Sequence, residues 1–323
     1  MIDVRKHPWL IGLVIVLSLV AVACGGGGQP ASKQPAGTGE ELAGTIDIDG
    51  SSTVFPITQA AAEEFQLDHP GVDVPVGISG TGGGFKKFCN GETDISDASR
   101  PIKDSEKEAC ASKGIEWVDF TVAFDGLSVM VNPANEFVEC LTTEELHKIW
   151  QPNSTVKTWA DVRPEWPAEP IVLYGPDADS GTFDYFTEEI NGEDGATRTD
   201  YTPSADDNVL VQGIAGDRDA LGYFGYAYYV ENTDKLKLVA IDSGNGCVLP
   251  TPETIENGEY TPLSRPLFIY VRKDSLKRPE VQAFVEFYLS DAGMRLVPEV
   301  GYVNISQEAI EEQRAKLADA IGK

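Results

Sequence analysis

The sequence predicts an α/β protein built from largely parallel sheets. Segments with alternating or β-branched apolar residues, typical of strands, alternate along the chain with segments whose apolar residues recur at helical spacing. Once an N-terminal export signal is set aside, roughly 280 of the 323 residues remain, which is enough for two domains. Ligands of such folds bind at the carboxyl ends of the strands, so we expect a functional site there.

The N-terminus is typical of a lipoprotein export signal. Residues 1–23 carry a short basic segment and an apolar run shorter than the ~20 residues that a membrane-spanning helix needs. Cys24 in "AVAC" lies where such signals are cut, so we expect it to become the lipidated first residue of the mature chain. Residues 24–43 are rich in glycine and indicate a flexible tether.

An ordinary signal peptide or an uncleaved anchor is the alternative to lipidation at Cys24. In each case the folded part lies outside the cytoplasm. We expect it to be anchored to the cell membrane, and to be periplasmic if the cell has an outer membrane.

The cysteines fit an oxidising compartment. Without Cys24 an even number remains, which predicts two disulfides. Three pairings are open, and we favour the one that closes one loop locally and another within a later segment. The spacings match no zinc pattern, so no metal is expected. The favoured pairs are Cys89 with Cys110 and Cys140 with Cys247.

The charge balance excludes two classes of partner. The chain has 52 acidic and 25 basic residues, a formal net charge of −27. Such a protein is repelled by nucleic acid and by an anionic membrane surface. The acidic residues are scattered along the chain, as expected for a solvated surface.

The first half of the chain alternates strands and helices. A helix begins at Pro56, carries apolar residues on one face and stops at Pro70–Gly71. Ser105 and Glu108 form a capping box ahead of a second helix, which Gly114 closes. The strand-like segments are 45–51, 72–79, 93–99 and 117–133.

The second half continues the alternation. Thr142 and Glu145 form another capping box before "LHKIW". Helices are expected from Thr182 to Ile190 and from Pro279 onward. The strand-like segments are 171–175, 221–229, 236–241 and 267–273.

Three junctions between a strand and a helix share one chemistry. "GSSTVFP", "SGTGGGF" and "DSGTF" combine hydroxyl residues with glycines or a tight turn. A helix N-terminus has unpaired N–H groups and a partial positive charge, and hydroxyl groups with a closely approaching backbone complete a cradle for an anion. One such junction is more often an ordinary N-cap, because Ser, Thr and Asp are common caps. Three together indicate a single anion site.

Nucleotide-binding motifs do not account for these junctions. "GTGGGF" lacks the last glycine of G-x-G-x-x-G, and no lysine follows as a Walker loop requires. The glycines suit a small oxyanion better than a phosphate-containing cofactor, so no cofactor is expected.

The three junction motifs, in this order along the chain, resemble the phosphate-binding protein of the bacterial high-affinity phosphate ABC transporter. The resemblance also includes "DISDASRPI", "AFDGLSVMVNP" and "SRPLFIYVRK", and it runs from about Gly44 to about Tyr302. It implies a two-domain periplasmic-binding-protein fold of type II, the Venus-flytrap arrangement. By this analogy the first domain is 44–126 with 263–323, and the second is 127–262.

The resemblance also implies a function. The protein would be a monomeric solute-binding lipoprotein that buries inorganic phosphate between its domains and delivers it to an ABC permease, without catalysis. Carried over by motif, the ligand is held by Ser52, Thr53 and the Val54 N–H, by Gly80, Thr81 and Gly82, and by Ser180, Gly181 and Thr182.

The chain departs from better-known members at two positions. Pro176 stands where they have an arginine, and Arg100 stands where they have an acidic residue. We expect Arg100 to supply the cation from the other domain; a surface salt bridge is the alternative.

Phosphate keeps a proton near neutral pH, and a buried carboxylate that accepts it would repel sulfate. Asp125 is the first candidate and Asp207 the second, although Asp125 also suits a hinge turn before Gly126.

Two other functions compete. A binding protein for another oxyanion, such as sulfate or molybdate, is the closer alternative. An aspartic-type hydrolase is remote: "DSG" occurs at Asp179 and Asp242, but such enzymes are all-β and have apolar residues before the aspartate. A serine hydrolase finds no support, because His69 and His147 lie in no G-x-S-x-G context.

Overall fold

The computed structural model describes residues 42–178 and 180–323. The expected signal peptide, the lipidation site Cys24 and the tether up to residue 41 lie outside the described residues, as does Asp179. Within the described ranges, no helix has both the length and the apolar character to cross a membrane.

The apolar side chains form two large cores. One contains residues up to Ala123 and again from Leu267, and the other contains residues from Leu127 to Leu263 together with Val303. We call the elements around them the first lobe and the second lobe. The cores change over close to the expected domain boundaries, and the boundaries themselves stay a prediction.

The first lobe contains both ends of the described chain. Its elements are β1 (Gly44–Thr45), β2 (Ile48–Gly50), α1 (Phe55–Asp68), β3 (Val72–Asp73), β4 (Val76–Ile78), α2 (Gly80–Cys89), β5 (Ile95–Ala98), α3 (Asp104–Ser112), most of β6 (Trp117–Val131), β13 (Ser264–Arg272), the 3₁₀ helix η1 (Ser275–Lys277), α10 (Pro279–Tyr288), α11 (Asp291–Glu299) and α12 (Gln307–Ile321).

The second lobe is formed by the segment between β6 and β13. Its elements are β7 (Cys140–Thr142), α4 (Thr143–Trp150), α5 (Trp159–Val162), β8 (Val172–Pro176), α6 (Gly181–Asn191), β9 (Thr202–Ser204), α7 (Asp207–Gly216), β10 (Ala220–Gly225), α8 (Tyr226–Val230), β11 (Lys237–Asp242), β12 (Cys247–Val248) and α9 (Pro252–Glu256).

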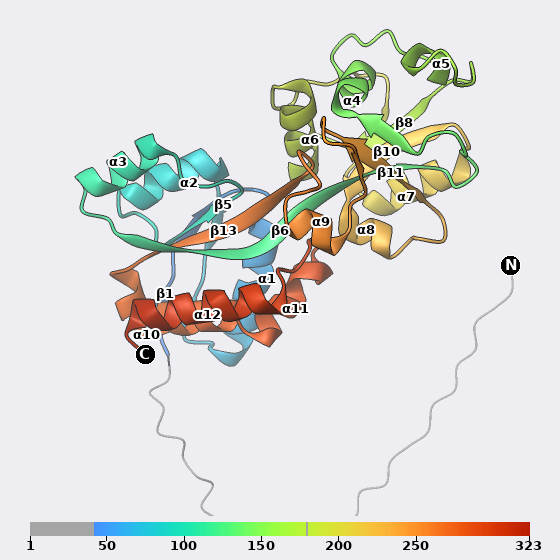
Figure 1. Cartoon of the computed structure of the whole chain (residues 1–323). Helices are drawn as coiled ribbons and strands as arrows, with labels where there is room; N and C mark the ends of the chain where they lie inside the picture. Colours follow the sequence, from blue (N-terminus) through green and yellow to red (C-terminus); the bar gives the residue numbers. More distant parts are fainter. Residues whose placement is uncertain (1–41, 179) are drawn as a thin grey trace, which may run out of the picture. The chain divides into compact units, whose positions relative to one another are not determined.

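Strand β6 joins the lobes, with β13 beside it (Figure 1). The two strands pair antiparallel from Gly126 with Ser264 to Trp117 with Arg272, and the far end of β6 pairs with β10 and β11. The sheet order is β4-β2-β5-β13-β6-β10-β8-β9. The expected parallel pairing is therefore found among the flanking strands, such as β2 with β4 and β5, while the crossing strands pair antiparallel.

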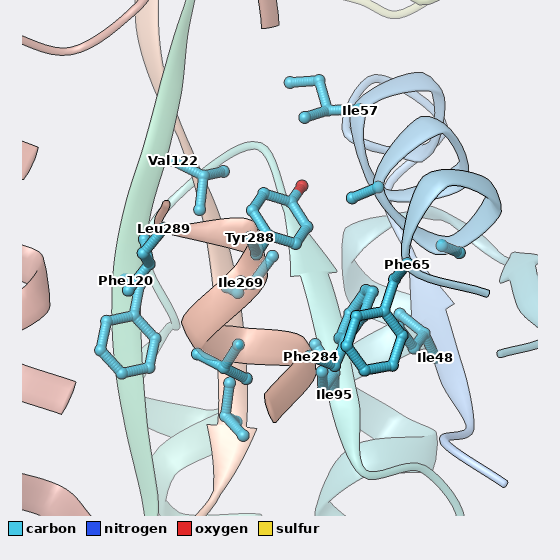
Figure 2. Close-up of a cluster of buried hydrophobic side chains, with 14 of the residues drawn as sticks. Ile48, Ile57, Phe65, Ile95, Phe120, Val122, Ile269, Phe284, Tyr288 and Leu289 are labelled. Carbon is cyan, nitrogen blue, oxygen red and sulfur yellow. The ribbon is translucent and has the colours of Figure 1, made fainter. Parts of the chain in front are cut away.

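Each lobe packs helices on both faces of its part of the sheet. In the first lobe, the rings of Phe65 on α1 and Phe284 on α10 meet edge to face, with their centroids 5.4 Å apart. Both rings belong to the core that includes the apolar residues of β2, β5, β6 and β13 (Figure 2). Helices α2 and α3 cover the other face through a smaller cluster around Phe85 and Tyr270. In the second lobe, Phe186 stacks on Tyr223 at 3.7 Å.

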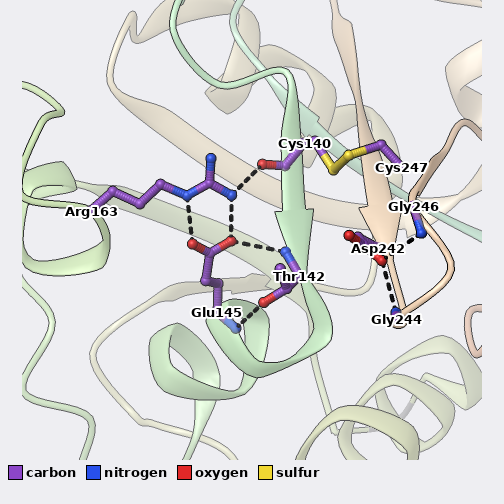
Figure 3. Close-up of a disulfide and its surroundings, with 8 residues drawn as sticks. All are labelled: Cys140, Thr142, Glu145, Arg163, Asp242, Gly244, Gly246 and Cys247. Atoms are coloured by element: carbon purple, nitrogen blue, oxygen red, sulfur yellow. Dashed lines mark hydrogen bonds and ion pairs between the residues drawn. A yellow bond between two sulfur atoms is a disulfide. The ribbon is translucent and has the colours of Figure 1, made fainter.

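Both favoured disulfide pairs are confirmed. Cys89–Cys110 joins the end of α2 to α3, and Cys140–Cys247 joins β7 to β12 over a sequence separation of 107. Near the second bridge, the Asp242 carboxylate accepts the N–H groups of Gly244 and Gly246 (Figure 3). The second "DSG" motif thus forms a tight turn beside β12.

Two local expectations were wrong. Helix α3 begins one residue before Ser105, and its N-terminus is capped from one side: the Glu106 carboxylate accepts the Lys103 N–H at 2.8 Å as well as the Arg100 guanidinium. The stretch 221–229 is a strand only as far as Gly225, and then turns into α8. The capping box of Thr142 with Glu145 is confirmed.

Candidate ligand-binding site

A cavity of about 530 Å³ opens between the lobes, where strands of the first lobe end and α6 of the second lobe begins. All three predicted junctions lie at or next to it. Its lining combines neutral hydroxyl groups, two arginines and four carboxyl groups. The lining residues are Ser51, Ser52, Thr53, Gly80, Thr81, Ser99, Arg100 and Pro101 of the first lobe, Asp184, Tyr185, Glu188, Glu189 and Asp194 of the second, and Thr261, Pro262, Ser264, Arg265 and Pro266 at the crossing.

The first junction is a tight turn between β2 and α1. The Ser51 N–H donates to the backbone oxygen of Asp97 at 3.0 Å, and the Ser51 hydroxyl accepts the Thr53 N–H at 3.2 Å. Helix α1 has no side-chain cap, but its first N–H groups have backbone partners. The Phe55 N–H donates to the backbone oxygen of Ser51 and the Ile57 N–H to that of Val54, both at 3.0 Å, and Pro56 has no N–H.

The second junction lies between β4 and α2. The Ser79 hydroxyl donates to Asp49 rather than capping the helix, and α2 likewise has no side-chain cap. The Thr81 hydroxyl lies 3.1 Å from that of Ser99 and accepts the Ser99 N–H at 3.2 Å. Gly80 has a φ of +72°, which favours glycine at this turn.

The third junction brings the second lobe against the first. A Cβ placed on Gly181 would lie 3.0 Å from Thr53 Oγ1 and 3.5 Å from Thr53 Cα, so the close approach of α6 to the first junction favours glycine at this position. The Ser180 hydroxyl accepts the Thr182 N–H at 3.2 Å as an ordinary N-cap. Its own proton remains able to donate to a ligand.

Uncapped helix ends at the cleft contrast with capped ends elsewhere. Helices α4, α5 and α9 carry capping boxes, and α7, α11 and α12 have a capping Asp or Ser. Helices α8 and α10 also lack a side-chain cap, but neither contributes a lining residue to the cavity. The start of α2, which has no side-chain cap, therefore suits an anionic ligand.

An arginine that the sequence reasoning missed lies at the centre of the site. Arg265, at the start of β13, donates to Thr53 Oγ1 at 3.0 Å and to Asp125 Oδ2 at 3.1 Å. Its guanidinium lies 3.7 Å from the ring centroid of Tyr185 on α6. One side chain thus contacts the first junction, the crossing strand β6 and the second lobe.

The predicted cation, Arg100, also lines the cavity but has a different partner. Its guanidinium makes a bidentate pair with Glu106 at 2.8 and 2.9 Å. Burial raises the pKa of Glu106, but the hydrogen bonds from Arg100 and from the Lys103 N–H lower it by more, so the net shift of this pKa is downward. The salt bridge that was the alternative for Arg100 is therefore present, and its expected role as the cation for the ligand stays a prediction.

The two candidate acceptors are not among the lining residues. Asp125 is buried beneath Arg265, where burial raises its pKa and the guanidinium lowers it. Asp207 begins α7, and burial together with Asp206 raises its pKa to about 6. The carboxyl groups that do line the cavity belong to α6 and the following loop. Among them, burial and then Asp194 raise the pKa of Asp184 to about 6.

Comparison with known proteins decides the family. The model of the PBP superfamily domain matches residues 35–292. The phosphate-binding protein PstS of Staphylococcus saprophyticus is 44% identical over 310 residues, covering 95% of this chain and 92% of the relative. The chain belongs to the PBP superfamily.

Two further proteins are similar to this chain at higher identity. The protein SphX of Synechocystis sp. is 49% identical over 275 residues, covering 84% of this chain and 82% of the relative. A crystal structure of a possible phosphate binding protein from Planctomyces limnophilus is 56% identical with a TM-score of 0.83, covering 87% of this chain and 99% of that chain. The fold inferred from sequence is confirmed.

Several of the predicted site residues come together at the cavity between the lobes. The structure brings Ser52, Thr53, Gly80, Thr81 and Arg100 onto one cavity wall and sets Gly181 against Thr53. It adds Arg265, whose signal in the sequence was an arginine opening an apolar strand within a motif already recognised, "SRPLFIYVRK". Within the described ranges, no cluster of three or more potential metal ligands occurs.

Proposed function

We propose that the protein captures inorganic phosphate in the cleft outside the cytoplasm and presents it to the permease of an ABC transporter, without chemical conversion. The observation that carries this proposal is the convergence of the uncapped start of α2, the close contact of Gly181 with Thr53, and Arg265. Neutral donors and one oriented guanidinium match a small oxyanion. The named relatives support phosphate as that oxyanion.

Domain closure is the proposed mechanism. Helix α6 reaches the first junction through Gly181, and Tyr185 of the same helix stacks on Arg265. A ligand between these groups would be contacted by both lobes, so its binding would favour the closed arrangement. The permease would then recognise the closed protein. Lipidation at Cys24 would keep the receptor at the membrane.

Discrimination against sulfate or molybdate is the finer part of the proposal. Donors alone accept any tetrahedral oxyanion, so a buried acceptor must face the ligand proton. Arg265 donates two hydrogen bonds to Asp125, and both go to Oδ2. Oδ1 is therefore the oxygen proposed to accept the proton of the ligand. Asp207 is the second candidate.

Calorimetric titration of the mature protein with phosphate, sulfate and molybdate tests the function. Phosphate alone should bind tightly. Asp125→Asn, which keeps the shape but replaces an acceptor by a donor, should weaken phosphate binding and admit sulfate. If Asp207→Asn admits sulfate instead, the acceptor is Asp207. Tighter binding of sulfate or molybdate by the wild type would assign the protein to another oxyanion.

Membrane attachment has its own test. Globomycin treatment, or Cys24→Ala, should prevent the lipid-modified form and release or mislocalise the protein. Mass spectrometry of the mature N-terminus provides the measurement. An unmodified N-terminus away from Cys24 would show an ordinary signal peptide.

A further inference from the structure

Asp97, at the end of β5, is a fully buried carboxyl group directly below the first junction. Its side chain is 0% exposed. Strand β5 lies between β2 and β13, with Asp97 in register with Gly50 on one side and Ile269 on the other. The residue is thus in the interior of the first lobe, outside the cavity wall.

Among the described residues, this carboxyl group accepts one hydrogen bond, from a neutral hydroxyl group. Its Oδ1 accepts the Thr58 hydroxyl of α1 at 3.0 Å, and that hydroxyl lies 3.0 Å from the hydroxyl of Tyr288 on α10. Figure 2 shows the Tyr288 hydroxyl pointing toward α1. The Oδ2 atom has no hydrogen-bond partner within the described part of the chain.

Other buried carboxylates of the first lobe and crossing are paired with a cation. Asp49 accepts from Lys87 at 2.6 Å, Asp94 from Arg278 at 2.9 Å, and Asp125 from Arg265 at 3.1 Å. A fully buried ionised carboxylate with one neutral donor is strongly unfavourable, so the group retains its proton instead. The contacts of Asp97 are those of a neutral carboxylic acid.

The surrounding charges act in the same direction. Burial raises the pKa of Asp97 to about 8, the Thr58 hydroxyl lowers it, and the negative charge of Asp49 on neighbouring β2 raises it. Lys87 of α2 is already paired with Asp49. On the α10 side, burial raises the pKa of Tyr288 well above its ordinary value, so that hydroxyl stays neutral over the same range.

Asp97 holds both sides of the first junction. Its backbone oxygen accepts the Ser51 N–H at 3.0 Å, while its side chain holds α1 through Thr58. The chain then continues directly to Ser99 and Arg100, which line the cavity. A change at this carboxyl group is therefore transmitted to the turn, to the helix that follows it and to the next wall of the site.

We propose that Asp97 is a positioning residue for the anion cradle, that it acts as a neutral acid, and that its ionisation at alkaline pH lowers phosphate affinity. This inference rests on the proposed function. Ionisation of Asp97 would put a second negative charge close to Asp49, and the Asp97 carboxylate would have one neutral donor. The ionised form would therefore hold the turn at Ser51 and the start of α1 less firmly. The apparent affinity then falls with the fraction of protein that keeps the proton.

The test is phosphate titration from pH 6.5 to pH 9 with wild type, Asp97→Asn and Asp73→Asn. Asn at 97 keeps the shape and cannot ionise, and Asp73 is an exposed residue of the same lobe that receives the same change. Phosphate changes its own ionisation equally for all three proteins. At neutral pH Asp73→Asn should match wild type, and Asp97→Asn should still bind phosphate. At pH 9 wild type and Asp73→Asn should bind about tenfold more weakly than Asp97→Asn.

Parallel pH profiles for wild type and Asp97→Asn would overturn the proposal. So would a folded Asp97→Asn protein that no longer binds phosphate at neutral pH, because the ionised form would then be the active one. Ligand-free thermal unfolding separates this inference from the proposed function.

A carboxyl group that keeps its proton only when folded makes the free energy of unfolding fall as pH rises from its ordinary pKa to about 8. The unfolding temperature of wild type should therefore fall relative to Asp97→Asn between pH 5 and pH 8, and an unchanged difference would show that Asp97 is ionised. If the wild-type protein binds no phosphate at pH 7, both the proposed function and the role of Asp97 in affinity are overturned. The difference in unfolding temperature between wild type and Asp97→Asn would still show whether Asp97 is protonated.

Discussion

The two lobes reach the cleft with similar helix ends that are held in different ways. In the first lobe, buried carboxyl groups support the junctions: Asp49 accepts the Ser79 hydroxyl, and Asp97 accepts the Thr58 hydroxyl. The backbone oxygen of Asp97 accepts the Ser51 N–H. In the second lobe, Ser180 caps its own helix, and the carboxyl groups of α6 line the cavity instead of supporting it.

This difference indicates a division of work. The first lobe has its donors fixed before the ligand arrives, with α2 uncapped and Arg265 tied to Thr53. The second lobe contributes a single close contact through Gly181 and the ring of Tyr185 over Arg265. Substitutions that remove a first-lobe donor should therefore cost more affinity than those in the second lobe.

The largest effect is expected from Arg265→Ala. Hydrogen bonds to charged groups contribute about 1.5–3 kcal/mol each. If the Arg265 guanidinium donates two hydrogen bonds to the bound anion, its loss should weaken phosphate binding about a hundredfold or more in calorimetry. The phosphate affinity of Arg265→Lys should lie between those of wild type and Arg265→Ala, because an ammonium group cannot make the same bidentate and stacking contacts. Arg100→Ala is the matched comparison, since Arg100 already has Glu106. A larger loss for Arg100→Ala would return the role of the cation to that residue.

Next in size is the contrast between Thr81→Val and Ser180→Ala. Thr81→Val removes a first-lobe hydroxyl without changing side-chain shape, and about tenfold weaker binding is expected. A loss of stability of about 1 kcal/mol is also expected, because the Ser99 N–H loses its acceptor. Ser180→Ala removes an N-cap, so its main effect should be about 1 kcal/mol on the stability of the protein. Equal losses of affinity would contradict the division between the lobes.

Gly181→Ala tests closure directly. The added Cβ would lie 3.0 Å from Thr53 Oγ1, and overpacking of this kind costs about 1–3 kcal/mol. The closed state should be disfavoured, with roughly tenfold weaker phosphate binding and a more extended scattering profile in the presence of ligand. Gly216→Ala is the control, because nothing lies within 4 Å of a Cβ at that position. An unaffected Gly181→Ala protein would mean that α6 need not approach Thr53.

The smallest effect is expected from salt. The protein carries a net charge of −27, so capture rests on short-range donors rather than on long-range attraction. Charges farther than ~8 Å are screened at physiological ionic strength, and phosphate affinity should change less than about twofold between low and moderate salt. A steep loss with added salt would indicate a basic funnel leading to the cleft.

Local chemistry made much of the site predictable. The junctions at Thr53, Thr81 and Gly181 were visible because hydroxyl and glycine residues follow strand patterns within a few positions. The central cation was not. Arg265 and Asp125 are 140 residues apart, and only the antiparallel pairing of β6 with β13 puts them opposite each other.

Competition between partners explains the remaining errors. Ser105 and Glu108 have the spacing of a capping box, but Glu106 already binds Arg100 and the Lys103 N–H, so the helix begins earlier. The acidic lining of α6 was hidden for a related reason. Asp184 and Glu188 look like ordinary solvated helix residues until the second lobe is placed against the first.

The return of the chain through β13 has a consequence for synthesis. Strand β13 lies between β5 and β6 in the sheet, so the first lobe lacks its central strand until residues 264–272 have been made. The second lobe is continuous between β6 and β13, and its bridge from Cys140 to Cys247 is complete before that point. When the chain emerges N-terminus first, the second lobe can therefore fold before the first lobe is complete. The first lobe, although its synthesis starts earlier, is completed only by the C-terminal segment.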